Sequence, residues 1–248
     1  GERGIFNREA SKKQAAKYGR RDSDWEFGTN PCSEIILRPY QFCNLTEVVV
    51  RATDTIESLE RKVRCATILG TIQSSYTKFP YLRKVWQRNT EEERLLGVSL
   101  TGIMDNPLMT TTNKGLEKTL ETLRKLSVST NHLWSARLGI PASTAITCVK
   151  PSGTVSQLVD SASGIHARHS KYYIRTVRGD NKDPLTQFMK DQGVPSEPDV
   201  MKPDATTVFS FPVKSPDNAV VTSDLSAIEQ LQIWLAYQRA WCEHKPSI

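Results

Sequence analysis

Short β-branched segments alternate with amphipathic helical patterns along most of this chain. Apolar residues that recur at intervals of three and four predict helices with one buried face. These patterns cover about residues 55–77, 90–105, 114–138, 183–193 and 224–244, the last beginning with Asp224 as a cap. Strands are predicted at 143–149, 171–177 and 206–213. This alternation predicts an α/β fold with parallel strands.

The composition indicates a globular protein with a substantial core. The chain has 248 residues, of which 38% are hydrophobic, and it has neither a secretory signal pattern nor an apolar run near the roughly 20 residues that span a bilayer. We therefore expect a soluble, cytoplasmic protein without membrane contact. The net charge of +6 includes a basic run at residues 11–21, which we interpret as a solvated helix face, so no specific nucleic-acid partner is expected.

Cysteine spacing excludes the common zinc motifs. The five cysteines are Cys32, Cys43, Cys65, Cys148 and Cys242. The cysteines form no CxxC pair and are not accompanied by paired histidine ligands, so no metal site is expected. Cys65, Cys148 and Cys242 fall in predicted helices or strands, where a cysteine is usually a small buried apolar residue.

The remaining two cysteines lie in the stretch "TNPCSEIILRPYQFCNL", residues 29–45. Pro31 disfavours helix before it, and the apolar residues after Glu34 favour an extended chain. In an extended chain Asn30, Cys32 and Glu34 share one face. Two interpretations remain open at this point, because such a face is either the polar side of an ordinary strand or a catalytic set. Cys43, which follows Cys32 by eleven residues, favours redox or radical chemistry.

A second stretch, "CVKPSGTVSQ", has the parts of an anion-binding turn. A strand ends at a proline, a small Ser-Gly-Thr turn follows, and a helical segment begins there. Glycine lets the backbone approach a ligand, and the helix start supplies free N–H donors. Ordinary helix capping explains the same residues equally well. Lys150 is not in P-loop register.

Together with "LLGVSLTGIMD" and "WCEHKPSI", these stretches occur in the order found in the catalytic region of ribonucleotide reductases. The chain resembles the adenosylcobalamin-dependent (class II) type, in particular its ribonucleoside-triphosphate reductase branch, over essentially its whole length. The resemblance implies part of a ten-stranded α/β barrel. Residues 1–24 would be a leading segment, residues 25–50 the active-site finger loop, and residues 51–248 the second half-barrel with the phosphate-binding turn.

The resemblance also implies a role for each site residue. Cys32 would be the thiyl-radical residue that removes the ribose 3′ hydrogen, Glu34 the base for the 3′ hydroxyl, and Asn30 a hydrogen-bond partner of the ribose. Cys43 would be one thiol of a redox-active disulfide. The substrate phosphates would bind Pro151, Ser152, Gly153, Thr154, Val155 and Ser156. Adenosylcobalamin would be the cofactor and a thioredoxin-type protein the reductant, in the production of deoxyribonucleotides for DNA synthesis.

Some expected parts of such an enzyme are not found in these 248 residues. They are the thiol partner of Cys43, the C-terminal cysteine pair and the N-terminal allosteric region, so we expect missing N-terminal and C-terminal portions of the same enzyme as partners. Lys245 stands where we expect Asn. His166 and His169, near the expected cobalamin side, are interpreted as polar or packing residues.

Two alternative functions remain. The large subunit of a class I reductase would need a tyrosine pair near its C-terminus, whereas Tyr172 and Tyr173, in a predicted strand, are the one adjacent pair here. A non-catalytic nucleotide-binding module would not need Asn30, Cys32 and Glu34.

Overall fold

The computed structural model describes residues 5–112 and 114–247. Two compact units are present. The first unit consists of Gly1–Arg168 together with Asn218–Ile248. The second unit is His169–Asp217. Residues 1–4 of the predicted leading segment and residues 113 and 248 of the predicted half-barrel lie outside the described residues. That the whole chain acts as one catalytic region stays a prediction.

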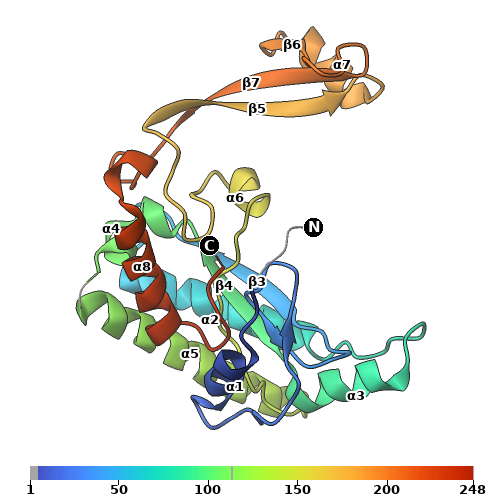
Figure 1. The fold of residues 1–248 in the computed structure, drawn as a ribbon, viewed down its shortest axis with the longest axis vertical. Helices are drawn as coiled ribbons and strands as arrows, with labels where there is room; N and C mark the ends of the chain where they lie inside the picture. The colour runs from blue at the N-terminus through green and yellow to red at the C-terminus, as the bar shows by residue number, and fades with distance from the viewer. Residues whose placement is uncertain (1–4, 113, 248) are drawn as a thin grey trace. The chain divides into compact units, whose positions relative to one another are not determined.

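A parallel sheet lies at the centre of the first unit (Figure 1). Strand β3 (Asn44–Val49) pairs with β4 (Leu96–Thr101) in parallel over their full lengths. Parallel bridges from Val98 to Thr147 and from Val149 to Pro246 then extend the sheet by two further extended segments. The predicted parallel α/β arrangement is therefore present in this unit, and residues 143–149 are extended although only isolated bridges form there.

Three long helices pack with this sheet. They are α2 (Ile56–Gln73), α5 (Lys114–Leu138) and α8 (Ala227–Ala240). α2 contacts both strands, and α5 contacts α2 and α8 (Figure 1). Ser226 is the N-cap of α8, and its hydroxyl accepts a hydrogen bond from Glu229 N–H. Asp224, the predicted cap, instead belongs to a short 3₁₀ turn, because Ser226 and Glu229 form a reciprocal capping box two residues later.

Shorter elements complete the first unit. The helices are α1 (Arg8–Ala16), α3 (Lys84–Glu93), α4 (Pro107–Thr110) and α6 (Val155–Leu158). The 3₁₀ turns are η1 (Ile103–Asp105) and η2 (Thr222–Asp224), and the short strands are β1 (Gly28–Thr29) and β2 (Ile36–Leu37). In the described residues, no helix combines the length and apolar character needed to cross a membrane.

The prediction of a helix at about 90–105 is wrong over most of that range. α3 ends at Glu93, and the following apolar residues form β4. Every residue of β4 is buried, so the strand lacks the alternation of apolar and polar residues that identifies a strand exposed on one face. Cys65 lies in α2 as predicted, but it is exposed rather than buried.

The second unit is an antiparallel structure. Its elements are β5 (Tyr172–Asp180), α7 (Pro184–Asp191), β6 (Ser196–Pro198) and β7 (Thr206–Lys214). The strand order is β5-β7-β6, with antiparallel pairing throughout. The predicted strands and short helix are confirmed, but the prediction of parallel strands is wrong here, because β7 returns directly alongside β5 without a crossover helix.

The sheet of the first unit has two chemically different faces. Val48, Val98 and Leu100 belong to the main hydrophobic core, which includes residues from α2, α5 and α8. Glu47 and Ser99 alternate with these residues and therefore point to the opposite face. We call these the helix face and the polar face. The polar face carries the candidate site.

Candidate active site

The segment Gly28–Leu37 forms a hairpin, here called the cysteine hairpin. β1 and β2 pair in antiparallel fashion, and Ser33 N–H donates to the Asn30 carbonyl oxygen (3.0 Å) at the tip. Asn30 Oδ1 accepts a hydrogen bond from Ile35 N–H (3.0 Å). Ser33 has a φ of 64°, which lies in the left-handed region used in turns. The prediction of an extended chain here is wrong, because the Asn30 side chain stabilises a turn.

The turn gives the predicted site residues different environments. Cys32 is exposed at the tip, whereas Glu34 is fully buried. Asn30 is partly buried, and its side-chain oxygen is used within the hairpin. The three side chains therefore do not share one face by strand alternation. Cys32 is accessible to a large reactant, and Glu34 is removed from water.

Residues near the end of the chain hold the cysteine hairpin against the sheet. His244 Nδ1 accepts a hydrogen bond from Ile36 N–H (3.4 Å). Lys245 N–H donates to the Glu34 carbonyl oxygen (3.0 Å), and Ser247 Oγ donates to the Cys32 carbonyl oxygen (2.8 Å). Each of these bonds reaches a different residue of the hairpin. The backbone that carries Cys32 and Glu34 is therefore positioned by contacts distant in sequence.

Lys150 is the common neighbour of the acid and the thiols. Its Nζ lies 2.7 Å from Glu34 Oε1. Burial lowers the pKa of Lys150, but the hydrogen bond and negative charge of Glu34, with smaller contributions from Cys148 and Cys32, leave that pKa raised. Lys150 also acts on the pKa of Cys43. The structure thus places all these groups within electrostatic range of one ammonium.

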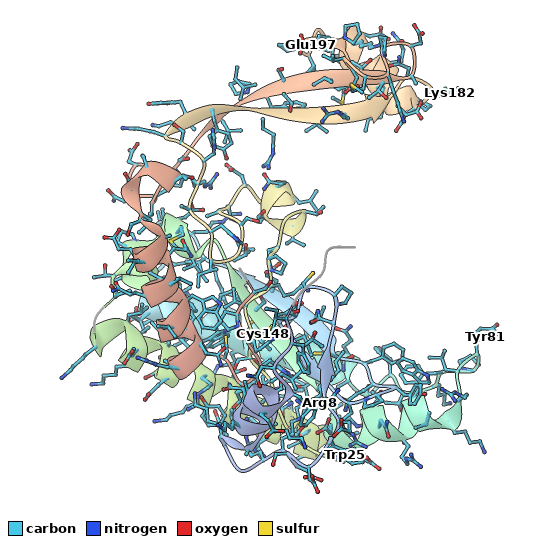
Figure 2. All side chains as sticks on the ribbon, in the orientation of Figure 1. Arg8, Trp25, Tyr81, Cys148, Lys182 and Glu197 are labelled. Carbon is cyan, nitrogen blue, oxygen red and sulfur yellow. The ribbon has the colours of Figure 1, made fainter. Side chains whose placement is uncertain are left out.

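Cys43 and Cys148 lie on this side of the sheet as protonated thiols. Cys43 immediately precedes β3 and is half-buried. Cys148, which is labelled in Figure 2, is fully buried. Burial raises the pKa of Cys43, with Glu34 adding to the increase and Arg21 opposing it. Burial also raises the pKa of Cys148, and the next largest contribution comes from Cys43. Both thiols are therefore unreactive as nucleophiles at neutral pH, because the thiolate is the reactive form.

The predicted anion turn adjoins the same face. Ser152 has a φ of 50°, and its hydroxyl donates to Glu47 Oε1. Ser99 Oγ donates to the same oxygen (3.1 Å). Burial raises the pKa of Glu47, and these two hydroxyl bonds partly oppose the increase. The Ser152 hydroxyl is therefore already engaged by a carboxylate.

The rest of the turn is mostly open to solvent. Gly153, Thr154 and Val155 are exposed, Pro151 is partly buried and Ser156 is buried. Ser156 N–H donates to the Ser152 carbonyl oxygen (3.1 Å). Across the described residues, the N–H groups of Gly153, Thr154 and Val155 donate no hydrogen bond. These donors suit an anion, although α6 after them is only one turn long.

Sequence reasoning missed several residues of this site. Lys150 and Glu47 were given no role, Cys148 was interpreted as a packing residue, and Ser247 was not considered. For two of these residues, their position relative to the sheet could have indicated a role. Lys150 follows the extended segment that ends at Val149, and Glu47 lies in β3. Polar groups at the ends of parallel strands commonly form ligand sites.

Comparisons with known proteins identify the relatives of this chain, although no family model matches it. An adenosylcobalamin-dependent ribonucleoside-triphosphate reductase of Lactobacillus gasseri is 30% identical over 291 residues, which cover 100% of this chain and 37% of that protein. The protein of the same name from Euglena gracilis is 29% identical over 251 residues, with 98% and 33% covered.

A solved structure, the crystal structure of a B12-dependent (class II) ribonucleotide reductase, has a TM-score of 0.77 to this chain. The identity is 27%, and the match covers 89% of this chain and 34% of that one. This chain is a homologue of these reductases. It spans about a third of the length of the curated relatives that it matches. The alternatives of a class I large subunit and a non-catalytic nucleotide-binding module are not favoured by these matches.

The exposed hairpin tip fits a reaction with a large cofactor. The Cys32 thiol is accessible without opening the hairpin, so a group as large as adenosylcobalamin can approach it. Cobalamin carries its cobalt in the corrin ring and needs no cluster of protein ligands. Among the described residues no group of three or more His, Cys, Asp or Glu side chains is arranged to hold a metal ion.

Proposed function

We propose that this chain carries the radical cysteine, the base and the phosphate-binding turn of an adenosylcobalamin-dependent ribonucleoside-triphosphate reductase. The observation that carries the proposal is the state of Glu34. Its Oε2 is buried and, among the described residues, has no hydrogen-bond partner, and it belongs to the same hairpin as the exposed Cys32. An unpaired buried carboxylate oxygen is costly and is typical of a site that binds a ligand.

The chemistry of the chain's own residues follows from this arrangement. Bound adenosylcobalamin would supply a radical equivalent by homolysis of its cobalt–carbon bond. The Cys32 thiyl radical would then take a hydrogen atom from the ribose 3′ carbon, so that an S–H bond forms as a C–H bond breaks. Glu34 Oε2 would accept the proton of the 3′ hydroxyl. The side-chain amide of Asn30, through its N–H donors, would bind a ribose hydroxyl.

The reduction itself requires two electrons from thiols. Cys43 would supply one thiol of the pair, which closes to a disulfide as the ribose 2′ hydroxyl leaves as water. Its high pKa keeps it protonated and therefore able to deliver hydrogen together with an electron. A thioredoxin-type reductant would then reopen the disulfide. The second thiol would come from another part of the enzyme.

The turn at Pro151–Ser156 would bind the substrate triphosphate through its free N–H groups. Ser152 would do so only after its hydrogen bond to Glu47 is exchanged, because its hydroxyl has one proton to donate and a phosphate oxygen is also an acceptor. The first unit would contribute part of a ten-stranded α/β barrel, completed by the remaining portions of a cytoplasmic enzyme.

The test is a chimera in which residues 1–248 replace the matching third of the Lactobacillus gasseri relative. With adenosylcobalamin, a ribonucleoside triphosphate and dithiothreitol, the chimera should form deoxyribonucleotide. Cys32→Ser should abolish product formation, because a hydroxyl O–H bond is too strong to replace a thiol as the hydrogen-atom donor. Circular dichroism checks that both chimeras are folded. A folded Cys32→Ser chimera with near-parental turnover, or a folded parental chimera without product, contradicts the proposal.

Cys43→Ser tests the separate redox role in the same chimera. Electron paramagnetic resonance should still detect radical formation, because Cys32 is intact, but repeated turnover should stop. Sustained product formation by Cys43→Ser contradicts the assignment of Cys43 without contradicting that of Cys32.

A further inference from the structure

The two oxygens of the Glu34 carboxylate are in different states. Lys150 Nζ donates to Oε1 (2.7 Å), whereas Oε2 is buried and, within the described part of the chain, accepts no hydrogen bond. The ion pair therefore divides the carboxylate into an occupied oxygen and an available one. A carboxylate that rotated freely would not present one defined acceptor to a substrate.

Lys150 is itself held in place. Its backbone N–H donates to Ser99 Oγ (2.9 Å) on β4. A Cβ atom at Gly164, where φ is 53°, would lie 2.4 Å from the Lys150 carbonyl oxygen, so the chain packs directly against this residue. The Lys150 side chain is only 24% exposed. Both ends of the lysine are thus fixed, one by the sheet and the other by Glu34.

A second lysine near Glu34 provides a comparison. Lys245 reaches Glu34 through its backbone N–H, which donates to the Glu34 carbonyl oxygen. Burial lowers the pKa of Lys245, and Glu34 opposes this only in part. Lys150, in contrast, forms the ion pair with the Glu34 side chain in the described residues. Only one of the two ammonium groups therefore controls the orientation of the carboxylate.

We infer that Lys150 is a positioning residue for catalysis, which holds Glu34 Oε1 so that Oε2 faces the substrate as the proton acceptor. This inference rests on the proposed function. Lys150 immediately precedes the turn at Pro151–Ser156, so the same residue joins the base to the phosphate-binding segment. The side chain that orients the base and the segment that would bind the triphosphate therefore lie on one continuous stretch of chain.

A competing role for Lys150 is direct binding of the substrate phosphates. The two roles predict different kinetics. Loss of a phosphate ligand weakens substrate binding and raises KM, whereas loss of an oriented base lowers kcat with little change in KM. The ion pair with Glu34 favours the positioning role, because a lysine committed to a carboxylate at 2.7 Å has to leave it to bind phosphate.

The experiment compares four substitutions in the chimera described above. Lys150→Met keeps the length of the side chain and removes its charge, and Lys150→Arg keeps the charge. We expect Lys150→Met to lower kcat by at least 10-fold with KM for the triphosphate within 2-fold, and Lys150→Arg to recover part of kcat. In Lys150→Ala, added propylammonium should restore turnover. Lys62→Met, which removes a lysine that pairs with Asp54 rather than with Glu34, is the matched control and should retain near-parental kcat.

The same pair is measured independently of turnover in the 248-residue chain. Urea unfolding of Lys150→Met, Glu34→Gln and the double variant should give non-additive shifts, because the two side chains contact each other. A raised KM with unchanged kcat, an unchanged kcat in Lys150→Met, or strictly additive unfolding shifts overturns the inference. A parental chimera without product instead overturns the proposed function, and coupled unfolding shifts would then still support the ion pair.

Discussion

The helix face and the polar face of the central sheet use the same two strands for opposite purposes. On the helix face, Val48, Val98 and Leu100 are buried among other apolar side chains. On the polar face, Glu47 and Ser99 share hydrogen bonds with Ser152 and with the Lys150 backbone. Apolar burial stabilises a fold without specifying a ligand, whereas buried polar groups cost free energy unless each has a partner. Strand alternation therefore places the apolar contacts that stabilise the fold on one face of the sheet and the polar groups of the candidate site on the other.

The largest effect on stability should come from the helix face. Leu120 lies in α5 and is fully buried in the core. Leu120→Ala should lower the free energy of unfolding by about 2–5 kcal/mol, since it removes apolar contacts and leaves a cavity. Urea unfolding of the 248-residue chain measures this change. At a temperature where the variant is folded, its affinity for a ribonucleoside triphosphate should equal that of the parent. A large loss of affinity in the folded variant would show that the two faces are not separable.

How well the sequence predicted each element depends on which of its faces are buried. The helix at Lys114–Leu138 was predicted because its apolar residues recur at helical spacing on one buried face. β4 was missed because both of its faces are buried, so its sequence carries no alternation. The cysteine hairpin was predicted as a strand because the turn depends on a hydrogen bond from Ile35 to the Asn30 side chain.

The candidate site was predictable in its residue types but less so in its contacts. Cys32, Glu34 and Cys43 were predicted as site residues because they occur together in one short motif. The partner of Glu34 was not, because Lys150 is 116 residues away along the chain. Periodicity reports which face a side chain occupies and not which distant residue meets it.

Gly97 tests the packing between the cysteine hairpin and the polar face. A Cβ atom here would lie 2.5 Å from Leu45 Cδ2, 3.0 Å from Ile35 Cδ1 and 3.4 Å from Cys148 Sγ. Gly97→Ala should therefore cost about 1–3 kcal/mol of unfolding free energy, as overpacking does, and should displace the hairpin. Thiol-labelling kinetics of Cys32 would detect that displacement.

Gly28→Ala is the matched control for this change. Gly28 lies in β1 of the same hairpin, and an added Cβ atom would meet nothing within 4 Å. Its unfolding midpoint and Cys32 labelling rate should stay near those of the parent. If the two substitutions had equal effects on stability and on Cys32 labelling, the close packing around Gly97 would not be the cause of the effect there.

The smallest expected effect is a pH dependence from His244. Its Nε2 donates to the Leu96 carbonyl oxygen (2.9 Å) while Nδ1 accepts from Ile36, so the ring is neutral. Burial, with the charge of Arg21 adding to it, lowers its pKa from 6.5 to about 3. Below pH 6.5 the unfolded chain binds a proton that the folded chain does not, so stability present above pH 6.5 is lost as the pH falls toward 3.

Between pH 7 and pH 5.5 this loss should be roughly 1 kcal/mol, by linkage of proton binding to unfolding. Urea unfolding at the two pH values measures it. His244→Gln keeps a donor for the Leu96 carbonyl oxygen but does not titrate, so it should be less stable at pH 7 and show a smaller difference between the two pH values. An identical difference in parent and variant would assign the pH dependence to other groups.

The hydrogen bond from Ser247 to the Cys32 carbonyl oxygen has a consequence for the order of folding. It joins residues 215 positions apart, and the bonds from Ile36 and to Glu34 connect the same two segments. Contacts with such long sequence separation form late, because closing a long loop costs entropy before any contact compensates for it. The segment with the exposed thiol should therefore reach its final geometry only after both ends of the first unit have met. A nascent or partly folded chain would therefore hold Cys32 without the contacts from Lys245 and Ser247 that position the cysteine hairpin.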